Sequence, residues 1–139
     1  MADSVLVVTS GLTLITSQLL ALGVVAPSWL QWGVGTTAPA AANVDLETKT
    51  DCNEDRVDGT DSVETTTLDD DTYRVVGTIT KEDAIAAITE VGTFNAASVT
   101  DPPDGDTMFL RATFSAINLV IGNSIAFTID TKFVPVATP

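Results

Sequence analysis

The chain has 139 residues, which is long enough to bury a hydrophobic core within one domain. Six basic residues oppose 19 acidic ones, histidine is absent, and the formal net charge at pH 7 is -13. This balance argues against nucleic-acid binding, because proteins hold phosphates with patches of Lys and Arg. It favours a halophilic protein, since concentrated salt screens the repulsion between surface carboxylates. An acidic surface on an ordinary mesophilic protein is the alternative.

The N-terminal part of the chain contains a long uncharged stretch, with no charged residue between Asp3 and Asp45. Its apolar run over residues 11–25 is short for a membrane-spanning helix, is interrupted by polar residues and is followed by Pro27. A secretory signal begins with basic residues, whereas this chain begins with Met-Ala-Asp-Ser. We therefore expect buried structure here and no membrane partner.

A helix is predicted over about residues 10–23. The apolar face of this helix is predicted by Leu12, Ile15, Leu19 and Leu22, which recur at three- and four-residue spacing, and it is widened by Leu14 and Leu20. Residues that cap or end helices lie at the expected places: Thr9 or Ser10 as the N-cap, with Gly23 and Pro27 after the last turn.

Alternating apolar positions and β-branched residues predict strands from about residue 28 to residue 134. The expected strands cover residues 28–35, 62–67, 72–80, 87–94, 107–114, 115–120 and 123–133. Gly122-Asn123 predicts a hairpin turn before the last strand. One helix followed by antiparallel strands predicts a mainly β fold, an antiparallel β-sandwich with one N-terminal amphipathic helix, in a single domain over residues 1–139.

The segment over residues 45–71 holds more than half of the acidic residues, opposed only by Lys49 and Arg56. Its early spacing resembles that of a calcium loop, but Arg56 stands where such a loop needs glycine and Ser62 where it needs glutamate. The three residues with the matching spacing are Asp51, Asn53 and Asp55. We therefore expect a solvated, loop-rich segment and no metal site.

The strand over residues 88–94 contains one carboxylate, Glu90, within an apolar run. A buried carboxylate must find a partner, because an unpaired one is costly. The predicted partner is either Arg56 or Arg111, with Glu47 as a further member of an ion-pair network. Solvated surface charges are the alternative, and these would contribute little to stability.

A pair of tryptophans precedes a Gly-x-Gly at residues 33–35. The glycines predict a turn or a close approach of backbone, since the glycines, lysine and helix of a phosphate-binding loop are missing. Large apolar residues of the helix and strands are expected to pack in the core or at a subunit interface. These candidates are Leu12, Ile15, Leu19, Trp29, Trp32 and Phe94.

Catalytic chemistry finds little support in the residue types present. There is no histidine to act as a base, and the single cysteine, Cys52, has no activating partner. The many carboxylates leave a glycosidase-like acid pair open, but they cluster without aromatic sugar platforms. We expect no enzyme and no cofactor.

Short motifs follow one another in an order that resembles small structural proteins of tailed bacterial and archaeal viruses. The order is more distantly similar to the N-terminal domain of tail-collar fibres. In both groups a helix leads to a Gly-rich turn, an L-x-E…R segment and an I-x-E-x-G-L-F strand. The matching residues, between Thr9 and Phe133, are Ser10-Gly11-Leu12, Gly33-x-Gly35, Leu46-Glu47, Arg56, Val75-Val76-Gly77-Thr78-Ile79, Ile88-Thr89-Glu90-Val91-Gly92-Thr93-Phe94 and Met108-Phe109-Leu110-Arg111-Ala112.

The chain departs from that pattern in three ways. Thr93 replaces an aliphatic residue, Leu46 and Glu47 are adjacent, and no fibre repeat follows Phe133.

The resemblance implies a non-enzymatic virion protein that assembles symmetrically with itself, commonly as a trimer, and contacts major capsid or tail proteins. A head-surface decoration or turret component is the first expectation. The alternatives are a tail, baseplate or tail-fibre attachment adaptor and a host-surface-binding module. The acidic composition adds the expectation of a halophilic archaeal host.

Overall fold

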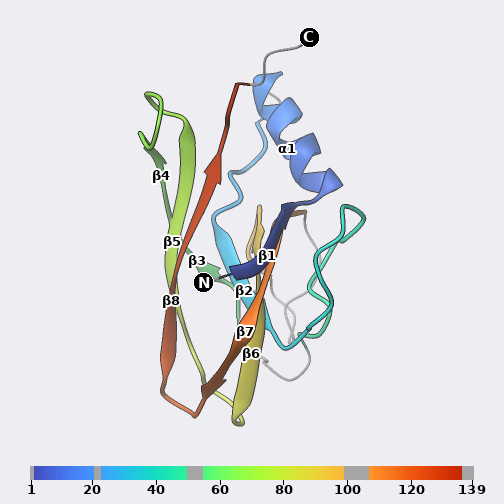
Figure 1. Cartoon of the computed structure of the whole chain (residues 1–139), viewed down its shortest axis with the longest axis vertical. Helices are drawn as coiled ribbons and strands as arrows, with labels where there is room; N and C mark the ends of the chain where they lie inside the picture. Colours follow the sequence, from blue (N-terminus) through green and yellow to red (C-terminus); the bar gives the residue numbers. More distant parts are fainter. Residues whose placement is uncertain (1, 21–22, 50–54, 99–106, 136–139) are drawn as a thin grey trace.

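Two antiparallel β-sheets face each other, with one short helix beside them (Figure 1). This computed structural model describes residues 2–20, 23–49, 55–98 and 107–135. The predicted mainly β sandwich with an N-terminal helix is confirmed. The elements are β1 (Ala2–Val7), α1 (Thr9–Leu19), β2 (Trp29–Gly33), β3 (Val57–Asp58), β4 (Thr60–Glu64), β5 (Thr72–Thr80), β6 (Ala86–Phe94), β7 (Met108–Leu119) and β8 (Ser124–Lys132).

The strand order is β1-β7-β6-β2-β3 in the larger sheet and β4-β5-β8 in the smaller one. The chain passes between the sheets at Gly59, where an added Cβ would lie 2.8 Å from Val75 Cγ1. It passes again in the β5–β6 and β7–β8 connections. The predicted hairpin at Gly122-Asn123 is therefore wrong: the backbone does turn there, but β7 and β8 belong to different sheets.

The main core fills the space between the sheets. In β8, Ile125, Phe127 and Ile129 all face this core, as their alternation predicts. The buried members of the core are Leu14, Leu30, Trp32, Val75, Ile79, Ala86, Ile88, Val91, Phe109, Leu110, Ala112, Leu119 and Phe127.

Helix α1 begins earlier and ends earlier than predicted, at Thr9 and Leu19. Its N-cap is Val8, in an extended conformation without a side-chain capping bond, so the expected Thr9 or Ser10 cap is wrong. The Ser10 hydroxyl instead donates to the Met108 carbonyl of β7 at 2.7 Å. This bond ties the first turn of the helix to a neighbouring strand.

The buried face of α1 agrees with the prediction only in part. Leu14 is buried and Ile15 partly buried, whereas Leu12 and Leu19 are exposed. Gly11 explains why another side of the helix faces the sheet, because an added Cβ at this position would clash with the Phe109 carbonyl oxygen. The helix therefore packs on β7 along the side that carries its glycine. Leu22, expected on the same apolar face as Leu12 and Leu19, lies outside the described residues.

Strand boundaries differ in three further places. β1 lies before the predicted strand region, and β7 is one strand where two were expected, over residues 107–114 and 115–120. β1 pairs with the first half of β7, so it depends on a partner about a hundred residues away. The acidic segment 45–71 includes β3 and β4, and β4 starts before the expected 62–67 strand.

The carboxylate of Asp71 organises the β4–β5 turn. It accepts the backbone N–H groups of Thr66, Thr67 and Leu68 at 3.0, 3.0 and 2.9 Å. The Leu68 N–H contributes most to lowering the pKa of Asp71 below its ordinary value, and the bonds from Thr66 and Thr72 add to this effect against the opposing effect of burial. Folding therefore favours the ionised form.

We predict that Asp71→Asn destabilises the protein in a pH-dependent way. The contribution of Asp71 is fully present above the pKa of the unfolded carboxyl, about 3.9, and is lost as the pH falls from there toward the lower folded value. The stability gap between wild type and variant, measured by urea unfolding, should thus be largest near neutral pH and shrink below about pH 4. The exposed Asp69→Asn in the same turn is the control. A gap that stays constant down to pH 2 would contradict the assignment.

Candidate functional site

Strand β6 is buried on both of its faces. Ile88 and Val91 belong to the core between the sheets, while Glu90 and Phe94 contact the segment that follows β2. The β6–β7 register shifts between Ile88 and Glu90. Such bulges redirect side chains, and this one accompanies the placement of Glu90 on the outer face of the larger sheet.

Residues 34–48, here called the covering loop, lie over this outer face, on the side away from β4, β5 and β8 (Figure 1). Its backbone supplies three donors to the Glu90 carboxylate. Oε1 accepts the N–H groups of Gly35 and Thr48 at 3.0 and 2.9 Å, and Oε2 accepts the N–H of Glu47 at 3.1 Å. Glu90 is completely buried.

Arg111 completes the set of donors to this carboxylate. Its Nε donates to Glu90 Oε2 at 2.8 Å, and the Arg111 side chain is 2% exposed. The other two guanidinium nitrogens reach the covering loop, Nη2 to Glu47 Oε2 at 3.1 Å and Nη1 to Asn43 Oδ1 at 3.3 Å. A guanidinium suits this position because its planar fork can satisfy several acceptors.

Both glycines of the Gly-x-Gly make room for this carboxylate. An added Cβ would lie 2.5 Å from Glu90 Oε1 at Gly33 and 2.6 Å from it at Gly35. The predicted close approach of backbone is therefore confirmed. Thr89, next to Glu90, adds a hydrogen bond from its hydroxyl to the Gly35 carbonyl at 2.8 Å.

Glu47 holds the solvent side of the same network. Its carboxylate accepts the Thr37 N–H and hydroxyl, both at 2.9 Å, in addition to Arg111. The bonds from Thr37 lower the pKa of Glu47, and Arg111 lowers it further, against the opposing effect of partial burial. Glu47 thus fastens the two arms of the covering loop to each other.

Arg56, the other predicted partner, does not bind Glu90. Its guanidinium carbon lies 3.7 Å from the centre of the Phe94 ring, and its Nε donates to Gln31 Oε1 at 2.9 Å. Cations favour this position over an aromatic face. The structure therefore brings Glu47, Glu90 and Arg111 together and places Arg56 beside them on Phe94.

The predicted aromatic anchors take different positions. Trp32 is 1% exposed in the main core, whereas Trp29 is partly buried. Trp29 and Phe94 belong to a second, smaller core under the covering loop, together with Val8, Leu46 and Met108. Trp32 and Phe94 are thus core anchors. Of the six anchor candidates, Leu12 and Leu19 present the most exposed side chains.

This arrangement is closed to substrates, since each Glu90 oxygen accepts two hydrogen bonds and the carboxylate has no solvent access. Within the described ranges, no group of three or more acidic, Cys or His residues could hold a metal ion. No helix in the same ranges has the length and hydropathy needed to cross a membrane. Cys52 and the calcium-like Asp51 and Asn53 lie outside these ranges.

Three of the four hydrogen bonds to the Glu90 carboxylate were not predicted from the sequence. The donors from Gly35, Glu47 and Thr48 are backbone N–H groups, which any residue other than proline carries. Only the two glycines signalled a close approach. Comparisons of the chain with protein-family models, curated proteins and solved structures found no match.

We predict that Glu90→Gln lowers the free energy of unfolding by about 3–5 kcal/mol, because it leaves the buried Arg111 without its main counter-charge. Urea unfolding measures this loss. Arg74→Met, which breaks the more exposed Arg74–Asp130 pair, is the control and should have a much smaller effect. Combining Glu90→Gln with Arg111→Met should cost less than the sum of the single changes. Additive losses, or a harmless Glu90→Gln, would contradict the network.

Proposed function

We propose that this chain is a non-enzymatic structural protein in the virion of a tailed virus of a halophilic archaeon. It acts as a head-surface decoration or turret component and assembles symmetrically with itself. The proposal is supported chiefly by one observation: segments that carry the resemblance to tailed-virus proteins meet around the Glu90 carboxylate.

These segments are far apart in the chain. They are the Gly33-x-Gly35 turn, the Leu46-Glu47 step, the strand with Glu90 and the strand with Arg111. Each motif is short, but in this fold each one needs the others: the glycines admit the carboxylate, and the arginine neutralises it. Their mutual dependence supports treating them as one set.

The chemistry of the cluster supports a structural function over a catalytic one. A catalytic carboxylate must reach its substrate, whereas Glu90 is enclosed and fully hydrogen bonded. Its bonds fasten a covering loop to a sheet, which stabilises architecture. Two alternatives would use the same architecture. One is a tail, baseplate or fibre-attachment adaptor, which would occupy another place on the particle, and the other is a module that binds the host surface.

The direct test is to locate the chain on purified virus particles. We predict that mass spectrometry detects it in the particles and that immunogold labelling places it on the head surface, with pre-immune serum as the control. Labelling confined to the tail or baseplate would replace the head assignment with the adaptor. Absence of the chain from purified particles would overturn the virion function.

The halophilic part of the proposal has its own test. Raising KCl from about 0.1 to 1 M shortens the screening length from about 10 to 3 Å, which relieves repulsion within a chain of net charge -13. We predict that the melting temperature rises by about 5 °C or more over this range. Sucrose at matched osmolality is the control for solute exclusion, which stabilises folded proteins without screening charge, so the rise in KCl is compared with the rise in sucrose. A melting temperature independent of KCl would contradict the halophilic assignment.

A further inference from the structure

Large apolar side chains are exposed at both ends of the molecule, and at the end that carries the last turn of α1 they surround an apolar hollow. The C-terminal end of α1 and the end of β8 reach this end together (Figure 1). We call it the apical face and define it by five exposed residues: Leu19, Leu20, Val25, Phe133 and Val134. Scattered exposed apolar residues are common, but a group of them around a hollow marks an interaction site.

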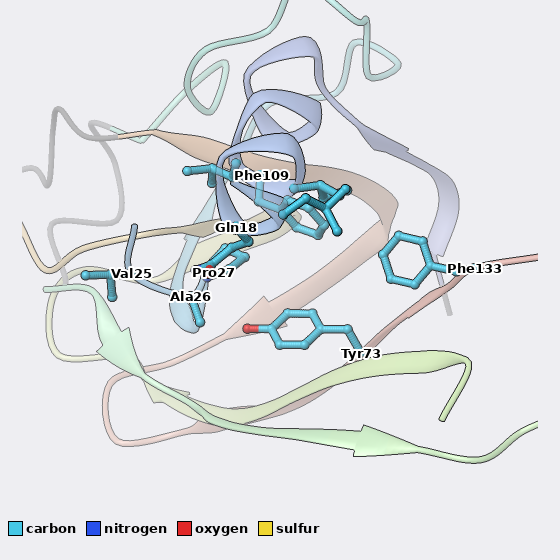
Figure 2. Close-up of a pocket in the computed structure, with 10 residues that line it drawn as sticks. Gln18, Val25, Ala26, Pro27, Tyr73, Phe109 and Phe133 are labelled. Carbon is cyan, nitrogen blue, oxygen red and sulfur yellow. The ribbon is translucent and has the colours of Figure 1, made fainter. Parts of the chain in front are cut away.

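The apical face includes such a hollow, of about 400 Å³, between α1 and the two sheets. Figure 2 shows Phe109 beneath the helix, with Tyr73 and Phe133 along the opposite side. None of the ten lining residues is charged. Burial raises the pKa of the Tyr73 phenol, and the carboxylates of Asp61 and Asp58 raise it further, so this group is neutral at pH 7 as well.

The distribution of charge indicates which kind of partner can bind this face. The chain carries a net charge of -13, yet residues 4–44, which supply α1 and the segment after it, contain no charged residue. Two copies repel each other wherever their acidic surfaces meet, and a face built mainly from this uncharged stretch reduces that cost. A cationic partner would be drawn to the acidic surfaces instead, and anionic partners are repelled by the net charge.

We infer that the apical face binds a second copy of this chain. The face is self-complementary, since it combines protruding side chains, Leu19 and Leu20, with an apolar hollow on the same end of the molecule. The inference rests on the proposed self-assembly and names the surface that carries it. High salt strengthens such an association, because it screens the repulsion between copies while the buried contacts are apolar.

The test compares Leu20→Glu with Ile85→Glu. Both side chains are 72% exposed, so the two variants add the same charge at sites of equal exposure. Ile85 lies in the β5–β6 connection, at the opposite end of the long axis from α1 (Figure 1). Analytical ultracentrifugation in 1 M KCl measures the association, and the wild type should sediment as a closed oligomer. Leu20→Glu should raise the dissociation constant about tenfold or more, and Ile85→Glu should leave it unchanged.

Cross-linking identifies the contact independently of any loss of folding. In a Cys52→Ser background, Leu19→Cys should be joined between copies by a short bismaleimide, whereas Ile85→Cys should not. An oligomer that tolerates Leu20→Glu and does not cross-link at residue 19 would overturn the apical face but leave self-assembly in place. If the protein is a monomer at all concentrations, both the apical interface and the proposed self-assembly are overturned, even if the chain is found in virions. A monomer that binds phosphatidylcholine vesicles through Leu20 would assign the face to lipid instead.

Discussion

The buried carboxylate of Glu90 is the constraint on which the outer half of this structure depends. An ionised group without access to water is tolerated only when its hydrogen-bonding capacity is filled and its charge is balanced. Here three backbone N–H groups and Arg111 meet both requirements. The covering loop is therefore held in place by its hydrogen bonds to the Glu90 carboxylate as well as by apolar contacts.

Several local features follow from that requirement. The register shift between β6 and β7 accompanies the outward placement of Glu90, and Gly33 and Gly35 leave space for its oxygens. Once fastened, the covering loop places Leu46 against Phe94 and closes the smaller core. Arg56 then covers the Phe94 ring. A buried ion pair is seldom worth more than a well-packed apolar replacement, so its contribution here is to hold one particular loop conformation.

Charged and uncharged parts of the sequence also have different positions in the fold. Charges within the fold are enclosed and neutralised, as in the Glu90–Arg111 pair, or hold a turn, as in Asp71. The uncharged stretch over residues 4–44 supplies the helix and three of the five residues of the apical face. An acidic chain that must associate with copies of itself benefits from such a division, since repulsion and attraction then act on different surfaces.

Local periodicity was enough to predict the fold class, the single helix and the facing of β8, because each depends on neighbours a few residues apart. The sequence also indicated that Glu90 needs an arginine, since an unpaired carboxylate in an apolar strand is too costly. Only the tertiary structure decided between Arg56 and Arg111, because that choice depends on strand order and on a bulge. It also decided which side of α1 is buried, where a backbone contact at Gly11 outweighed the leucine pattern. Those outcomes are set by contacts between distant segments, which no local pattern contains.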